Sequence, residues 1–192
     1  MPSPIGHSIV GYLGYRYGFQ NKENGNMKAM FFCILCANLP DLDFLPGLII
    51  GQSDRFHGGI SHSMVVSFIL ASIMPLALST KNAKGLGRIW LLLLGIFISH
   101  PILDFLAIDT GYPFGKPLFW PISADYYQSP ILLFSDVWRS PSSSDFFISL
   151  FSWHNFYAVL REILVMSSLI ALLKMALITQ RRFKEGLIKD MA

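Results

Sequence analysis

The chain has 192 residues, of which 53% are hydrophobic and only 14% are charged, and its mean hydropathy is +0.48. Soluble domains carry about 25% charged residues, so this composition predicts a membrane protein, of a length that fits one domain. The net charge of +3 is small and dispersed, which argues against nucleic acid as a partner. The first residues lack a basic start, an apolar core and a small-residue cleavage site, so we expect no secretory signal peptide.

Apolar segments predict the helices. In chain order they are 4–19, 27–37, 64–79, 89–108 and 158–178. The last three approach the roughly 20 residues that cross a bilayer. The second is shorter and stops at Asn-Leu-Pro-Asp-Leu-Asp, where the ring of Pro40 favours a break. We therefore predict an all-α fold in one domain, 1–192: a polytopic membrane bundle with short and broken helices, whose outer loop is 109–157.

Two details concern helix contacts. Gly6, Gly11 and Gly14 place a smooth strip on the first helix, which is suited to close helix packing in lipid. Arg161 and Glu162 lie near the start of the last helix, where we expect them to reach the interface.

The basic residues predict an orientation. Three clusters lie between the first and second segments, between the third and fourth, and after the last: Arg16, Lys22 and Lys28; Lys81, Lys84 and Arg88; Arg181, Arg182, Lys184 and Lys189. The positive-inside rule makes these clusters cytoplasmic. The other loops carry only Arg55, Lys116 and Arg139. We therefore expect the N-terminus outside and the C-terminus inside.

Seven imidazoles and carboxylates are the most informative residues. They are His7, Asp41, Asp43, His57, His62, His100 and Asp104. Ionisable groups beside or inside membrane segments are expensive and mark functional sites. In the predicted topology all seven lie at the outer ends of their segments. Because nitrogen and oxygen ligands suit zinc, we predict that the seven share one metal site.

Each local pattern also has a simpler interpretation. His100 and Asp104 share a helix face, next to Pro101, but a His–Asp hydrogen bond could merely tie helices together. The pair Asp41 and Asp43 could belong to a capped turn, although apolar residues follow at once. His57 and His62 could lie in a loop in which Ser61 or Ser63 caps the next helix.

Three other polar groups are predicted to be structural. Cys33 and Cys36 form a C-x-x-C in an apolar stretch, which favours small buried thiols over a zinc knuckle or redox site. His154 follows Trp153, which resembles an interfacial anchor.

The chain resembles the YdjM-type family of bacterial inner-membrane, LexA-associated metal-dependent hydrolases. The motifs that carry the resemblance are Gly-His7, Asn38-x-Pro-Asp41-x-Asp43, His57-x-Gly-x-Ser-His62-Ser, His100-Pro-x-x-Asp104 and a later stretch from Thr110 to Pro121. They cover about the first two thirds of the chain. The resemblance implies a multi-pass protein of the bacterial inner (cytoplasmic) membrane.

The order of ligands also resembles, more distantly, zinc-dependent phospholipase C and related fungal zinc nucleases. That resemblance implies a first zinc held by Asp43, His57, His100 and Asp104. Asp104 would bridge to a second ion bound by His7. Other divalent metals stay open, and so do two roles: Asp41 is a general base or a second-metal ligand, and His62 is a second ligand or a proton donor.

The simplest chemistry is hydrolysis by a zinc-bound hydroxide, since no serine-nucleophile motif, P-loop or dinucleotide fingerprint is present. A site at the outer helix ends would meet a lipid headgroup, so the first substrate class is a phosphoester or ester in a lipid or lipid-linked molecule. A soluble substrate stays open, because aromatic residues of the long outer loop could form a lid; they could equally anchor the interface. They are Trp120, Tyr126, Tyr127 and Trp138. The alternative function is a non-catalytic metal-binding membrane protein or a metal-ion carrier. The oligomeric state stays open.

Overall fold

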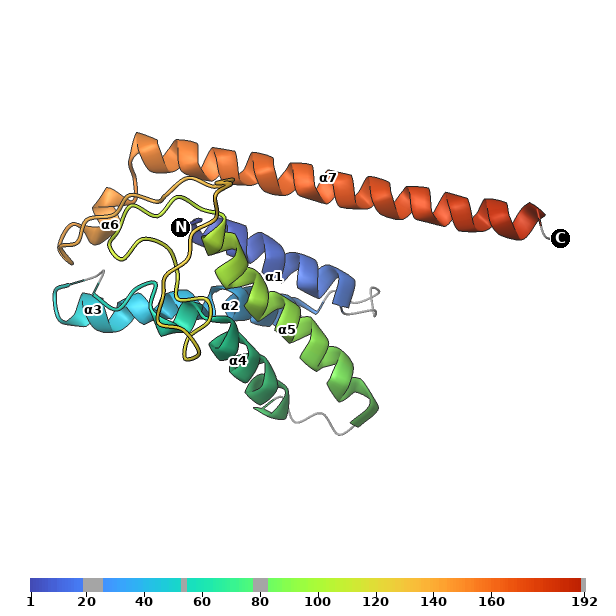
Figure 1. Ribbon diagram of the computed structural model, residues 1–192, viewed down its shortest axis with the longest axis horizontal. Helices are drawn as coiled ribbons and strands as arrows, with labels where there is room; N and C mark the ends of the chain where they lie inside the picture. The colour runs from blue at the N-terminus through green and yellow to red at the C-terminus, as the bar shows by residue number, and fades with distance from the viewer. Residues whose placement is uncertain (19–25, 53–54, 78–82, 191–192) are drawn as a thin grey trace.

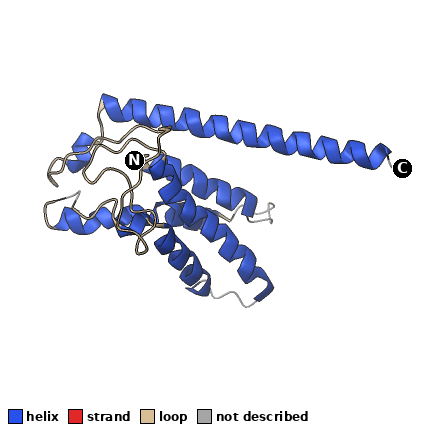
Figure 2. Cartoon of the chain, viewed as in Figure 1, coloured by secondary structure: helices blue, strands red, loops and turns tan. Residues whose placement is uncertain are grey.

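The structure, a computed structural model, describes residues 1–18, 26–52, 55–77 and 83–190, and for 83–85 and 184–190 it describes the backbone alone. The α-helices are α1 (Pro4–Gly18), α2 (Met27–Asn38), α3 (Leu45–Ile49), α4 (Met64–Ala77), α5 (Ala83–Phe105), α6 (Phe146–Ser149) and α7 (Trp153–Asp190). Two 3₁₀ helices are η1 (Leu39–Phe44) and η2 (Ile60–His62). No strand occurs in these described residues (Figure 2), which confirms the all-α prediction.

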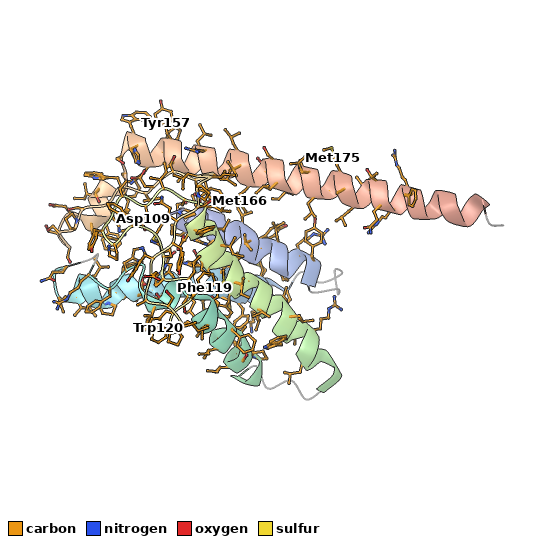
Figure 3. All side chains as sticks on the ribbon, viewed as in Figure 1. Asp109, Phe119, Trp120, Tyr157, Met166 and Met175 are labelled. Carbon is orange, nitrogen blue, oxygen red and sulfur yellow. The ribbon has the colours of Figure 1, made fainter. Side chains whose placement is uncertain are left out.

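The helices form a bundle that α7 crosses. Helix α1 packs against α2 and α5, α4 packs against α5, and α7 contacts the bundle through α1 (Figure 1). Loops, α3 and α6 gather at the end of the bundle where the N-terminus lies, while α7 continues well beyond the opposite end. Figure 3 shows the contrast along α7, where Met166 is buried but Tyr157 and Met175 are exposed.

Within the described residues, three helical stretches are long and apolar enough to cross a membrane: Met27–Ile49, Leu86–Phe105 and Trp153–Phe183. Helix α2 ends at Asn38, which confirms the predicted interruption of the α-helix there. The sequence did not predict that η1 continues the chain as a 3₁₀ helix that leads directly into α3. Segment 64–79 was predicted to span. Its described part, α4 to Ala77, has 14 residues and a rise of about 21 Å, short of the roughly 30 Å hydrocarbon core, while 78 and 79 lie outside the described residues.

Other predicted boundaries also differ. Helix α5 ends at Phe105 rather than at 108, because Ala107 pairs with Phe134 of the outer loop. Helix α7 extends past both ends of the predicted 158–178. Positions 19 and 79, where two segments were predicted to end, and the basic residues Lys22 and Lys81 lie outside the described residues.

Proline inside α5 is accommodated by a neighbouring helix. Pro101 has no N–H, so the carbonyl of Phe97 loses its usual helical partner. The hydroxyl of Ser67 in α4 donates to that carbonyl at 3.2 Å. Membrane helices tolerate proline when a side chain replaces the missing bond in this way. Helix α5 therefore continues through Pro101, and His100 and Asp104 stay on one helix.

The core lies between α2, α4 and α5. Its fully buried members include Cys33 and Cys36, which confirms the packing role predicted for these thiols. Gly11 permits α1 to approach the backbone of α2 closely: a Cβ atom there would lie 2.7 Å from both the carbonyl oxygen of Cys33 and the Cα of Ile34.

Gly11→Ala should therefore lower the stability of the protein by about 1–3 kcal/mol, the usual range for overpacking. Thermal unfolding in detergent measures the change. Gly95→Ala is the matched control, because in the described chain no heavy atom beyond the adjacent backbone of α5 lies within 4 Å of a Cβ at that position. Equal unfolding temperatures for the two variants would contradict the close contact of α1 and α2.

One contact of α7 corrects the sequence prediction. Glu162 does not reach the interface but is 2% exposed and faces α1. Its carboxylate accepts hydrogen bonds from the hydroxyl of Ser3 and the backbone N–H of Gly6. A carboxylate at the start of a helix satisfies free N–H groups there. Glu162 thus anchors α7 to the turn that carries His7.

Candidate metal centre

The seven predicted residues meet at one end of the bundle. His7 comes from the first turns of α1, Asp41 and Asp43 from η1, and His57 and His62 from the segment before α4, while the remaining two come from α5. Their imidazoles form a row: ring centroids lie 5.5 Å apart from His57 to His62, 4.8 Å from His62 to His100, and 3.9 Å from His100 to His7. Distant parts of the sequence therefore build one cluster.

Local structure explains how the segment before α4 presents its imidazoles. Gly58 has φ +74°, a conformation that side-chain-bearing residues rarely adopt, and its N–H donates to Asp43. Ser63 rather than Ser61 caps α4, since its hydroxyl oxygen accepts from the N–H of Val66 at 3.1 Å. Ser61 instead donates to Asp43.

The Nδ1 atoms of three imidazoles are held by hydrogen bonds. His100 Nδ1 donates to the carbonyl of Ala37 at 2.7 Å, and His57 Nδ1 donates to Asp43 at 2.7 Å. His62 Nδ1 lies 2.9 Å from the hydroxyl of Ser61 and 3.3 Å from Asp43. Because the Ser61 proton is given to Asp43, His62 is the donor in its contact with Ser61. A fixed Nδ1–H leaves Nε2 as the ligand atom, as is usual for metal-binding histidines.

The Nε2 atoms of the inner imidazoles converge on two carboxylates. His62 Nε2 lies 3.3 Å from Asp41 and 3.2 Å from Asp104, and His100 Nε2 lies 3.5 Å and 3.6 Å from the same two carboxylates. His7 Nε2 lies 3.5 Å from Asp104.

Several of these atoms are buried without a hydrogen bond. Among the described residues, none donates to or accepts from His100 Nε2, either nitrogen of His7 or either carboxylate oxygen of Asp104. Unpaired polar atoms in an interior are expensive, and charged ones more so. A divalent cation would accept the lone pairs of imidazole and carboxylate together. The donor set therefore fits a metal.

Three groups of side chains bring ligand atoms within 4.8 Å of one another. They are His7, Asp41 and His100; Asp41, His57 and His62; and His62, His100 and Asp104. Asp41, His62 and His100 each belong to two groups. For Asp41 and His62, the sequence had left a ligand role and an acid/base role open. Asp43 belongs to none of the groups found in the described residues, because it contacts the Nδ1 side of two imidazoles.

Electrostatics inside the cluster favour a cation. Burial alone would lower the pKa of His62, but the carboxylates of Asp41 and Asp43 outweigh burial and raise that pKa to about 9. The carboxylates therefore hold a proton on this imidazole at neutral pH. A metal must displace that proton, so metal and proton compete for the same position.

Asp43→Asn should weaken metal affinity about 10–100-fold without abolishing binding, because a carboxylate behind a ligand orients it and raises its basicity. Titration with a metal-buffered zinc series measures the affinity. Asp145→Asn, at an exposed loop position with no side-chain cap bond, is the control. Complete loss of metal in Asp43→Asn would instead make Asp43 a direct ligand.

A polar cavity adjoins the row of imidazoles at His57. It has a volume of about 310 Å³ and is lined by Arg55, His57 and parts of the outer loop that include Lys116 and Asp109. Sequence reasoning counted Lys116 only as a loop charge. It is 3% exposed and forms an ion pair with Asp109. The signal that could have singled out Lys116 is its position between Gly115 and Pro117, in a loop rich in aromatic residues.

The structure also shows the surroundings of His154 and of the aromatic residues of the outer loop. His154 is exposed, contacts Asp136 at 3.1 Å and belongs to none of the candidate metal groups of the described chain. Tyr126 and Trp138 line the cavity. Tyr127 packs edge-on against Phe119 in the loop.

A profile of the family described as YdjM inner membrane protein matches residues 1–182. The chain belongs to the YdjM family. It is also similar to the inner membrane protein YbcI of Escherichia coli (strain K12), with 31% identity over 106 residues, which are 54% of this chain and 59% of that relative. The match thus spans less than two thirds of YbcI. No solved structure matches this YdjM-family chain.

Family membership and the three apolar helices place the chain in the inner membrane. The profile match confirms the resemblance to the YdjM family. Four of the five motifs that suggested it contain residues of the cluster. The more distant likeness to phospholipase C stays a prediction.

Proposed function

We propose that this YdjM-family protein is a membrane-embedded, metal-dependent hydrolase that cleaves a phosphoester or ester bond in a lipid or lipid-linked substrate. A polar cavity reaches the cluster at His57. The observation that carries the proposal is the set of buried ligand atoms of His7, His100 and Asp104 that lack a hydrogen bond. Packing alone gives no reason to bury five such atoms without hydrogen bonds.

Zinc is the first candidate for the metal, because imidazole nitrogen and carboxylate oxygen are its common ligands. Two ions suit the length of the row. His7, His62 and His100 would bind through nitrogen, and Asp41 and Asp104, each close to several of these imidazoles, would be shared. Asp43 would orient His57 and His62 from behind.

When bound, divalent ions would lower the pKa of a water molecule and stabilise negative charge on the oxygen of the bond under attack. The chain's own residues then handle the proton. Hydrolysis adds the water oxygen to phosphorus or to the carbonyl carbon, breaks the ester bond, and requires a proton for the departing alkoxide. His57 lines the cavity and its Nδ1–H is held by Asp43, so its Nε2 would take a proton from the attacking water and pass it to the alkoxide.

The position of the cluster supports a lipid substrate. The seven side chains contact one another at one end of the bundle, where η1 and α5 adjoin the outer loop. A site at the end of membrane helices lies near the depth of lipid headgroups. A carrier would need access from both ends, and the cluster is at one.

The proposed orientation puts the cluster outside and the C-terminus inside. Helix α7 starts at the site end and runs past the other end of the bundle, where it carries Arg181 and Arg182 (Figure 1). Reporters fused after Ala192 and inserted near Ser142 should therefore be read in the cytoplasm and outside it, respectively. Finding both in one compartment would contradict the orientation and the crossing by α7.

The test of function starts with metal analysis of protein purified in a non-phosphate detergent. Zinc-loaded protein is then incubated with phospholipids, lipid phosphates and carboxylic esters in mixed micelles. We expect turnover of at least one lipid, loss of turnover with a chelator, and recovery with zinc. Stoichiometric metal without turnover of any lipid would leave a non-catalytic metal-binding protein. Turnover that survives chelation would overturn the mechanism.

A further inference from the structure

The cavity beside His57 is the strongest feature that the cluster itself does not explain. Three basic side chains line it, Arg55, Lys116 and Arg139, although they come from two separate segments of the chain. The outer side of this protein has few basic residues, and these are the three that sequence analysis found there. Their convergence on one cavity places positive charge next to the candidate metal centre.

Carboxylates in the cavity wall already have partners. Asp109 forms an ion pair with Lys116, and Asp136 lies 3.1 Å from His154 and 3.4 Å from the hydroxyl of Thr110. Among the described residues of the wall, three side chains are cationic and two are carboxylates, so their summed charge is positive. An anion is therefore the ligand that this wall favours.

Lys116 is built into the wall. Its backbone exchanges two hydrogen bonds of 2.9 Å with Tyr127, and its ammonium group donates to Asp109 and to the carbonyl of Gly115. These are two acceptors, among the described residues, for three N–H groups. The ammonium lies 3.1 Å from the place of a Cβ on Gly58, so the glycine allows the charge to approach the residue next to His57.

We infer that the cavity binds the phosphate group of the substrate through Lys116, Arg55 and Arg139, so that the bond cleaved is a phosphoester and not a carboxylic ester. This inference rests on the proposed function and deepens it. Guanidinium and ammonium groups are the usual partners of phosphate, and arginine can bind it with two parallel hydrogen bonds. A carboxylic ester group is neutral before it reacts, so it offers these three cations no anionic oxygen to bind.

The size of the cavity agrees with a headgroup. About 310 Å³ is at the lower end of ligand pockets and would hold a phosphorylated headgroup, whereas acyl chains would stay in the lipid. Exposed aromatic side chains of Tyr112 and Trp138 belong to the same wall, where they can meet the apolar part of such a substrate.

The test measures binding of inorganic phosphate to the full-length protein in maltoside detergent by ³¹P NMR line broadening, with and without zinc. We expect the metal-free protein to bind phosphate, and Arg55→Ala and Arg139→Ala each to weaken binding about tenfold. Because Lys116 is buried, its variant could disturb folding, so the two arginines carry the test. Arg161→Ala, whose guanidinium bonds to the loop at Ser135 outside the cavity wall, is the control.

Two competitors identify the source of the phosphate. Micellar phosphatidic acid should displace inorganic phosphate at least tenfold better than phosphocholine if the ligand is a lipid, and equal displacement would indicate a soluble phosphate ester. Acetate should not compete. Phosphate binding that is equal in wild type and both arginine variants would overturn the inference, as would hydrolysis of carboxylic esters alone. Phosphate binding without hydrolysis of any lipid would support the phosphate-binding cavity and contradict the proposed hydrolase function.

Discussion

His100→Ala should leave the purified protein with almost no tightly bound divalent metal while it stays inserted in the membrane. His100 Nε2 lies between two carboxylates, and its Nδ1–H is fixed by the carbonyl of Ala37, so the substitution removes an oriented nitrogen ligand from the middle of the row. Loss of a group that hydrogen-bonds to a metal ligand weakens metal binding about 10–100-fold, and loss of the ligand itself should weaken it further. Inductively coupled plasma mass spectrometry of equal amounts of protein measures the metal.

His154→Ala is the matched control for that prediction. It removes one imidazole from the same chain, but at an exposed position that contacts Asp136 rather than the cluster. It should keep the wild-type metal content. If His100→Ala also kept it, the His100–Asp104 pair would serve only to hold helices together.

Asp41→Asn should lose both metal and hydrolysis of the responding lipid, with a decrease in rate of at least about a hundredfold. Asp41 lies 3.3 Å from His62 and 3.5 Å from His100 and belongs to two candidate metal groups. An amide is a weaker ligand than a carboxylate and cannot act as a base. Metal content and initial rate, measured on one preparation, separate the two possible roles of Asp41.

If Asp41→Asn retained metal and lost only the rate, Asp41 would be the general base that the sequence suggested. Wild-type turnover in this variant would remove Asp41 from the site. Asp125→Asn, in the exposed part of the outer loop, should change neither quantity.

The sequence was sufficient for the membrane class, the order of the helices and the membership of the cluster. Long apolar segments leave few alternatives to helices in lipid, and expensive residues such as His100 and Asp104 are conspicuous there. The boundaries were harder to predict. Pro40 argues against an α-helix, but it does not show that a 3₁₀ helix will carry the chain onward through Asp41.

Roles within the cluster depend on side-chain direction, which spacing does not determine. Asp41 and Asp43 are two residues apart, yet Asp41 faces Nε2 atoms and Asp43 faces Nδ1 atoms. The same limit applies to α7. Ala158, Glu162 and Met166 are spaced four residues apart and are all buried. That periodicity could have placed Glu162 in a helix contact rather than at the interface.

The tertiary position of the outer loop was beyond sequence reasoning. Its irregular backbone pairs with distant positions, such as Ala107 with Phe134 and Gln52 with Ser142, and no local periodicity encodes those contacts. Consequently Lys116 and Arg139 could be counted as loop charges, but their meeting with Arg55 could not be foreseen.

X-ray absorption at the zinc edge, on zinc-loaded protein in lipid nanodiscs, tests the central claim most directly. Imidazole and carboxylate ligands predict nitrogen and oxygen neighbours at about 2.0–2.2 Å, with the outer scattering typical of imidazole rings and no sulfur at about 2.3 Å. His100→Ala should remove that signal. A sulfur shell would place the metal at Cys33 and Cys36 instead, and protein that retains no zinc after dialysis would contradict a metal centre in the His/Asp cluster.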